Sequence, residues 1–114
     1  MDLDANPKVG ASWEGFVVGE IIRRAEADRS ECFFWATYSG AELDLLVVRG
    51  SQRLGFEFKR SSSPAVTPSM RSALADLALT RLDVIYPGGN VFPLADRVRA
   101  VGIACLMDAI QPLR

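Results

Sequence analysis

The sequence contains no histidine and has only two cysteines, Cys32 and Cys105, which stand far apart and outside any C-x-x-C spacing. Without histidine the chain cannot use Ser-His or Cys-His catalysis, and it cannot bind a transition metal through imidazole. The cysteine spacing indicates neither a zinc site nor a disulfide framework, so we expect both thiols to pack as small apolar side chains. Any metal ion must therefore be a hard cation bound by oxygen atoms.

Long apolar runs are also missing, since none approaches the roughly 18 residues that a membrane span requires. The amino terminus, MDLDANPKVG, is acidic and polar, whereas a secretion signal is basic and then apolar. A soluble, cytoplasmic protein is therefore expected. A length of 114 residues with 49% apolar side chains suits one domain over residues 1–114. No G-x(4)-G-K-[ST] phosphate loop is present, which excludes ATP use through that motif.

Neither sign of charge dominates, because 13 basic residues oppose 14 acidic residues for a net charge of −1. Nothing in this balance marks a nucleic-acid-binding protein. A local basic patch would form only if the fold gathered five basic residues from separate segments. These are Arg23, Arg24, Lys59, Arg60 and Arg71. The alternative, in which these charges are scattered and solvated, stays open at this point.

The apolar pattern predicts the element order α-β-β-β-α-β followed by a small tail. In the first predicted helix, residues 10–27, Trp13, Val17 and Ile21 recur every four positions. Thr67 and Pro68 are typical of the cap and first position of a second helix. The predicted strands and the closing helix are residues 32–38, 42–49, 52–59, 82–86, 91–94 and 97–102, and residues 103–110.

Gly50-Ser51 predicts a two-residue hairpin loop between the second and third strands. Because such a loop fixes the register, Arg49 then faces Gln52 and Asp44 faces Glu57. Glu42 faces Lys59 on the same side of the hairpin, since strand side chains alternate with period two. The other side is expected to be apolar, with Leu43, Leu45 and Val47 opposite Phe58, Phe56 and Leu54.

Facing carboxylates destabilise a strand pair, so Asp44 opposite Glu57 needs a physical reason. A divalent cation gives one, because two carboxylates can share Mg²⁺ (or Mn²⁺), which takes oxygen ligands and keeps several waters. Lys59 could then steady a phosphate or orient the attacking water, and the set suits phosphodiester hydrolysis. The alternative is the ordinary solvated face of an antiparallel hairpin, where acidic and basic residues alternate.

Three segments carry a resemblance to a known family: GASWEGFVVGEII, FFWATYSGAELDLLVV and GFEFKRS. Together with VIYPGG and FPLADRV they resemble the DUF4143 domain, the carboxy-terminal region of bacterial and archaeal AAA+-type ATPases. This resemblance implies a PD-(D/E)XK nuclease-like, restriction-endonuclease-like α/β fold with an αβββαβ core and a mixed central sheet flanked by helices. Since no ATPase fits in 114 residues, the chain would be either an excised domain or a free-standing remnant.

The resemblance also implies site residues. The family's motif Asp falls on Asp44, its Glu on Glu57 and its Lys on Lys59, and the acidic position of the first helix falls on Glu14. The alternative for Glu14 is a helix-start carboxylate favoured by the helix dipole. Glu42 is expected to be the structural partner of Lys59.

Two functions follow as expectations from these residues. The first is a Mg²⁺-dependent DNA phosphodiesterase-like hydrolase, an endonuclease if it cleaves, associated with an AAA+-type ATPase. The second is a catalytically inactive nuclease-fold module that binds DNA or a protein partner. We expect Trp13, Trp35 and Phe34 to be core residues and not platforms for bases. The oligomeric state stays open, a homodimer included.

Overall fold

The computed structural model describes residues 11–113, and the side chains from Glu14 onward. Its main helices are α1, Ala11–Ala25, and α2, Pro68–Asp76. Three short helical segments, η1, η2 and α3, are Arg29–Glu31, Ile103–Cys105 and Leu106–Ala109. As predicted, Thr67 caps α2 by accepting a hydrogen bond from the Met70 N–H at 3.2 Å, and Pro68 follows at the first position.

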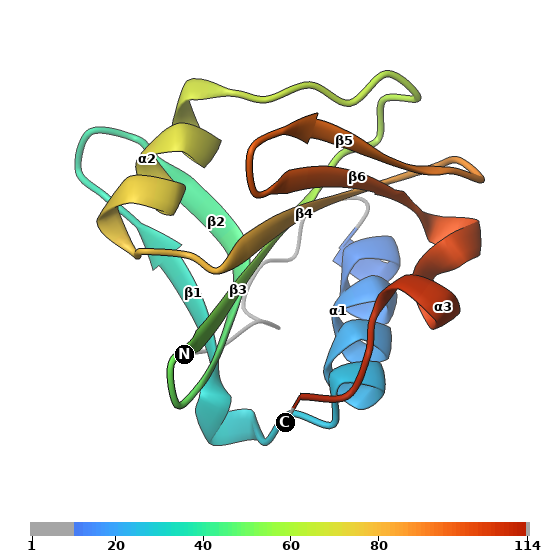
Figure 1. Cartoon of the computed structure of the whole chain (residues 1–114), viewed down its shortest axis with the longest axis horizontal. Helices are drawn as coiled ribbons and strands as arrows, with labels where there is room; N and C mark the ends of the chain where they lie inside the picture. Colours follow the sequence, from blue (N-terminus) through green and yellow to red (C-terminus); the bar gives the residue numbers. More distant parts are fainter. Residues whose placement is uncertain (1–10, 114) are drawn as a thin grey trace.

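Six strands form one mixed sheet in the order β1-β2-β3-β4-β6-β5 (Figure 1). The first three strands are antiparallel neighbours, whereas β3, β4 and β6 run parallel and β5 is antiparallel to β6. The chain is therefore an α/β protein in which α1-β1-β2-β3-α2-β4 precede a β5-β6 hairpin. The strands are Cys32–Ala36, Glu42–Arg49, Gln52–Phe58, Arg81–Tyr86, Val91–Ala95 and Val98–Gly102.

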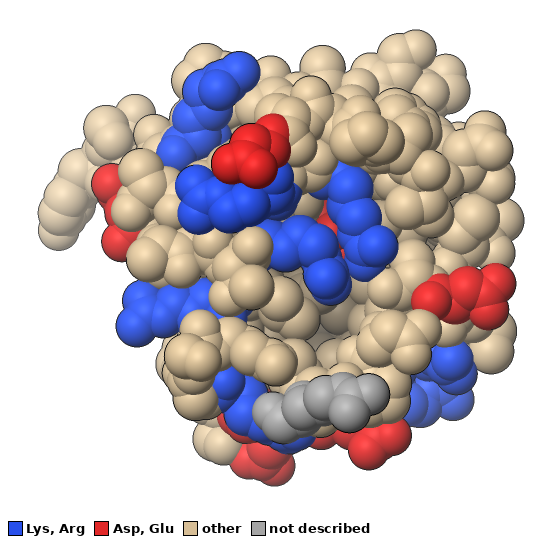
Figure 2. Space-filling view, viewed as in Figure 1, with Lys and Arg blue, Asp and Glu red and all other residues tan. Residues whose placement is uncertain are grey.

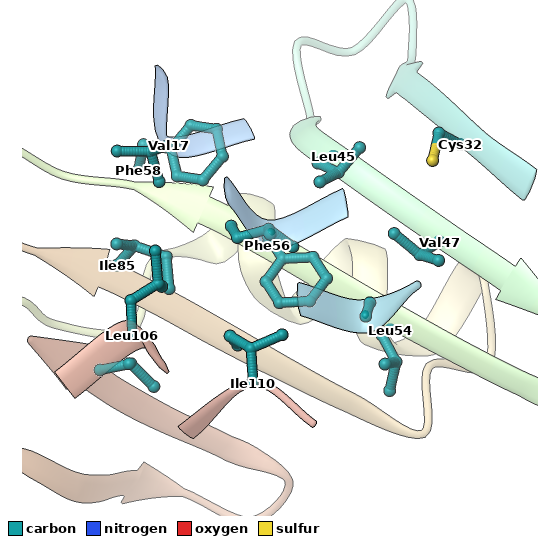
Figure 3. Packing of buried hydrophobic residues seen from close by; sticks show 13 residues of the cluster. Val17, Cys32, Leu45, Val47, Leu54, Phe56, Phe58, Ile85, Leu106 and Ile110 are labelled. Atoms are coloured by element: carbon teal, nitrogen blue, oxygen red, sulfur yellow. The ribbon is translucent and has the colours of Figure 1, made fainter. Parts of the chain in front are cut away.

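One face of the sheet packs against α1 and the carboxy-terminal α3. Val17 and Ile21 of α1 are fully buried there, which confirms the predicted four-residue spacing. Phe56 of β3 lies at the centre of this cluster, with Ile110 and Leu106 approaching it from the carboxy-terminal segment (Figure 3). Burying a phenylalanine of this kind contributes about 1.5–3 kcal/mol to folding.

The opposite face of the sheet packs against α2. Met70, Ala73 and Leu74 of this helix are buried against Leu82 and Val84 of β4. Gly55 of β3 faces the same layer, and a Cβ atom there would lie 2.7 Å from Leu79 Cδ1. The two layers together fix β3 from both sides, so the residues at its carboxyl end are held on a rigid strand.

The structure corrects the prediction for Phe34 and leaves one tryptophan outside its reach. Phe34 is 50% exposed on the edge strand β1, because nothing in the described part of the chain covers that edge. Trp35 packs against the α2-side cluster and Cys32 is buried, as predicted, whereas Cys105 is only half-buried. The side chain of Trp13 lies outside the described residues. Among residues 11–113, no helix is long and apolar enough to cross a membrane.

Candidate metal and phosphate site

The β2–β3 hairpin has the predicted register. Arg49 pairs with Gln52 around the Gly50-Ser51 turn, and the ladder continues to Leu45 opposite Phe56. Gly50 has a φ of +58°, a left-handed conformation that suits glycine in a tight turn. The next facing pair in this register is Asp44 and Glu57.

At that pair the backbone-to-backbone hydrogen bonds between β2 and β3 end. Hydrogen bonds from backbone N–H groups to the two carboxylates take their place. The Asp44 N–H donates to Glu57 Oε1 at 3.1 Å, and the Phe58 N–H donates to Asp44 Oδ2 at 2.9 Å. Beyond this point β3 stays with β4, since the Lys59 N–H donates to Ile85 O at 2.8 Å. The hairpin is therefore open at one end, and the two carboxylates lie in the opening.

A β-bulge helps to place Asp44. On β1, Phe33 pairs with Leu46 and Trp35 pairs with Leu43. The two β2 residues Asp44 and Leu45 therefore lie opposite the single β1 residue Phe34. Bulges of this kind re-aim side chains and are common beside functional sites. The bulge also corrects the predicted apolar face, because Leu43 joins the α2-side cluster while Leu45 and Val47 join the α1-side cluster.

Glu57 is a buried acid without a strong counter-charge. Its exposed fraction is 8%, and burial raises its pKa to about 8, with the Asp44 carboxylate as the second cause. Lys59 opposes this effect from a distance of 4.0 Å between Nζ and Glu57 Oε2. Near neutral pH without metal, Glu57 therefore holds a proton beside Asp44.

Asp44 and Glu14 belong to the same electrostatic neighbourhood. Burial raises the pKa of Asp44, the hydrogen bond from the Phe58 N–H opposes that rise, and the charges of Glu14 and Glu42 add to it. The first-helix carboxylate predicted from the resemblance thus comes close enough to act on Asp44. Three further acidic or basic groups, Glu14, Glu42 and Lys59, surround the facing pair.

The structure corrects the expected partner of Lys59. Its ion pair within the described residues is with Glu57, two positions earlier in the chain, and Glu42 is exposed. The backbone of Glu42 is instead tied to α2, because its N–H donates to Ser69 Oγ at 2.7 Å and its carbonyl accepts from that hydroxyl at 3.0 Å. This tie follows from the packing of α2 on β2, which the hairpin pattern alone does not reveal.

The carboxylate pair fits a hard divalent cation, because Asp44 and Glu57 each accept one backbone N–H and their side chains lie within hydrogen-bonding reach of each other. Mg²⁺ is often bound by one or two carboxylates, with waters and substrate phosphate completing its shell. No group of three or more Asp, Glu, Cys or His side chains suited to a metal occurs in residues 11–113.

Of the two arrangements left open for the basic residues, the structure favours the scattered one. Arg23 and Arg24 lie near the carboxyl end of α1, where Arg24 donates to Met107 O at 2.7 Å and Arg23 pairs with Glu20. Glu14 is at the other end of that helix. Sequence reasoning instead missed four arginines at the opposite end of the sheet, because parallel pairing of distant strands brings them together. These are Arg53, Arg81, Arg97 and Arg99.

Comparisons with known proteins confirm the DUF4143 part of the resemblance. No solved structure matches the chain. Two uncharacterized mycobacterial proteins, one from Mycobacterium bovis and one from Mycobacterium tuberculosis, are each 50% identical to it over 99 residues. That alignment covers 87% of this chain and 22% of each relative, so the chain spans about a fifth of their length. The model of DUF4143, a domain of unknown function, matches residues 9–106, and the chain belongs to this family.

Proposed function

We propose that Asp44 and Glu57 form the metal site of a PD-(D/E)XK nuclease-like fold, and that the chain is a Mg²⁺-dependent (or Mn²⁺-dependent) DNA phosphodiesterase-like domain. The observation that carries this proposal is the open end of the β2–β3 hairpin. There two partly or fully buried carboxylates face each other, with a lysine 4.0 Å from one of them. A facing pair of buried acids is costly to a fold unless a bound ligand uses it.

The element order supports the fold assignment. The segment from α1 to β4 has the αβββαβ order that the family resemblance implies, and the sheet is mixed with helices on both faces. The site also lies at the carboxyl end of the central strand β3, where β2 diverges from β3. The restriction-endonuclease-like name remains part of the proposal.

Each residue of the site has a role in the proposed reaction. Asp44 and Glu57 would hold the metal through their carboxylates, which the hairpin N–H groups keep in place. A bound Mg²⁺ supplies an activated water and neutralises charge on the phosphate. Lys59, whose side chain is 37% exposed, would contact that phosphate or orient the water. Glu14 assists by adding negative charge near Asp44.

A second function is favoured by a different observation. Both carboxylates already accept backbone hydrogen bonds from the facing strand, so they hold β2 and β3 together at this end of the hairpin even without a metal. In this alternative the chain is a catalytically inactive module that binds DNA or a protein partner. In either case the relatives are about five times longer than the matched segment, which leaves room for the AAA+-type ATPase that the resemblance implies as a partner.

The test separates the two functions through Lys59. Cleavage of supercoiled, linear and branched DNA is measured in Mn²⁺ and in Mg²⁺, and DNA binding is measured in parallel at several salt concentrations. For an enzyme, Lys59→Ala should lower the cleavage rate by about 100-fold or more while binding changes little, because the lysine acts on charge that develops in the transition state. For a binding module the same change mainly lowers affinity and flattens the salt dependence by about one ion.

The matched control is Arg71→Ala, which removes one exposed positive charge from the neighbouring helix α2. Cleavage that survives both Asp44→Asn and Lys59→Ala would rule out this site. Protein that binds DNA but cuts none of the three forms, even with a candidate ATPase added, would favour the binding module.

A further inference from the structure

Four arginines gather at the end of the sheet opposite the carboxylate pair. Arg53 lies at the start of β3, Arg81 at the start of β4, Arg97 directly before β6, and Arg99 near the start of β6. These three strands are parallel neighbours, so their amino ends meet at one edge. Figure 2 shows basic side chains gathered over the start of β4 and the β5–β6 turn, around a hollow in the surface.

A buried aspartate anchors two of these arginines. Asp83 is 1% exposed, and it accepts from Arg81 Nε at 3.1 Å and from Arg99 Nε and Nη2 at 2.7 and 3.1 Å. Arg99 Nη2 also donates to Ala109 O at 2.9 Å. A paired and fully bonded aspartate fixes the planes of both guanidinium groups, whose side chains keep 37% and 27% exposure.

Backbone carbonyls anchor the other two arginines. Arg53 Nη1 donates to Leu77 O at 3.0 Å, and Arg97 Nη1 donates to Leu79 O at 3.0 Å. Arg97 has a φ of +62°, a left-handed conformation that costs an arginine roughly 1 kcal/mol. Residues held in such conformations concentrate at functional sites.

The anchoring leaves donors for an outside ligand. Arg81 keeps both terminal nitrogens, Arg99 keeps Nη1, and Arg53 and Arg97 each keep Nη2 without an acceptor among residues 11–113. Within residues 11–113 the ion pairs of these four guanidinium groups are with Asp83 and Asp96, so the edge has more positive than negative charge in a chain whose net charge is −1. Fixed guanidinium groups with spare donors are well suited to phosphate.

We propose that Arg53, Arg81, Arg97 and Arg99 form a nucleic-acid backbone site, separate from the carboxylate pair. The outer strands of the three, β3 and β6, are two strand spacings or about 10 Å apart, so the set can contact more than one phosphate of a strand, with Arg81 and Arg99 on the α1 side of the sheet and Arg53 on the α2 side. The choice of nucleic acid over an acidic protein rests on the proposed function. The binding itself requires neither metal nor cleavage.

The experiment measures binding of a labelled 20-base-pair duplex and of the matching single strand by fluorescence anisotropy in EDTA, which removes divalent metal. The test variant is Arg53→Gln with Arg97→Gln, because neither residue supports the buried Asp83. The matched control is Arg23→Gln with Arg29→Gln, which removes the same charge from exposed positions on α1 and η1. Thermal unfolding should show both variants folded.

One released counterion per contact predicts a loss of roughly eightfold in affinity per arginine at 0.1 M salt, and a decrease of about 0.9 per arginine in the salt slope for the duplex. The control should change affinity by less than about twofold. Asp96→Asn, which removes a 97% exposed carboxylate 3.8 Å from Arg97 Nε, should tighten binding. This gain does not depend on the fold of the double variant.

Equal affinity and salt slope for the test and control variants would overturn the inference, as would a wild-type protein that binds no DNA in EDTA. Binding of polyglutamate in preference to DNA would overturn it in favour of an acidic protein partner. Arginine-dependent binding without any cleavage in Mg²⁺ or Mn²⁺ would support the inference while removing the proposed enzyme activity. The two proposals therefore fail separately.

Discussion

Glu57 and Asp83 are the two buried acidic residues of the described chain, and they differ in what surrounds them. They lie on the neighbouring strands β3 and β4, where Asp83 pairs with Phe56, the residue directly before Glu57, so their side chains point to opposite faces of the sheet. Asp83 is held by two guanidinium groups within 3.1 Å. Glu57 faces a second carboxylate, and its nearest ammonium group is 4.0 Å away.

The difference separates a structural acid from one that is suited to a ligand. The charge of Asp83 is neutralised inside the protein, and replacing it should mainly affect folding and the two arginines. The charge of Glu57 is not neutralised, so the metal-free protein keeps it protonated by raising its pKa to about 8. A divalent cation would neutralise Glu57 and Asp44 together, which is why we propose that the metal binds to this pair.

The largest expected effect is on stability, at Asp83 and the two arginines that hold it. Asp83→Asn should lower the free energy of unfolding by about 3–5 kcal/mol, because it removes the buried partner of Arg81 and Arg99. Urea denaturation at pH 7 measures this. Asp96→Asn is the control, and it should change stability by less than about 0.5 kcal/mol since Asp96 is almost fully exposed. A loss below about 1 kcal/mol for Asp83→Asn would contradict the structural role.

A smaller effect on stability, which depends on pH, is expected at the Asp44–Glu57 pair. A carboxyl whose pKa is raised from 4.5 to about 8 keeps its proton in the folded protein where the unfolded chain has lost it. The folded protein should therefore lose stability as the pH rises from about 4.5 to about 8, by on the order of a few kcal/mol.

The measurement is urea denaturation in metal-free buffer at several pH values across this range. Glu57→Gln should flatten the dependence, because it removes the titrating group and keeps the shape of the side chain. A wild-type protein whose stability rises over the same range would show that the Asp44–Glu57 pair is not destabilised as the geometry implies.

The smallest effect concerns Glu14. Its charge adds to the rise in the pKa of Asp44, so Glu14→Gln should lower the pKa of Asp44. Carbon-detected NMR titration of the Asp44 carboxyl measures the change. The control is Glu20→Gln on the same helix, since Glu20 pairs with Arg23 and should leave Asp44 unaffected. Equal responses to the two changes would remove Glu14 from the site.

The facing of Asp44 and Glu57 was predictable from the sequence, because a local turn determines it. Gly50-Ser51 specifies a tight turn, and the turn fixes the register that places Asp44 opposite Glu57. The wrong side assigned to Leu43 has a non-local cause. The bulge at Asp44 and Leu45 arises from the pairing of β2 with β1, which a hairpin pattern does not reveal.

The cluster of Arg53, Arg81, Arg97 and Arg99 was not predictable, because its cause is also non-local. Arg53 precedes Arg97 by more than 40 positions, and only the parallel pairing of β3, β4 and β6 brings their strands together. The exposure of Phe34 was also missed, because an aromatic residue on an edge strand looks in sequence like one in a central strand. In both cases the missing information is strand order.

The most direct test of the metal assignment is a calorimetric titration of the chain with Mn²⁺ at pH 7, performed in two buffers of different ionisation enthalpy. We expect one ion per chain and release of about one proton per ion, because metal must displace the proton held by Glu57. Asp44→Asn and Glu57→Gln should each abolish most of the binding, whereas the exposed control Asp108→Asn should bind as the wild type does. A wild-type protein that binds no Mn²⁺, or equal binding by all four proteins, would contradict a metal site at Asp44 and Glu57.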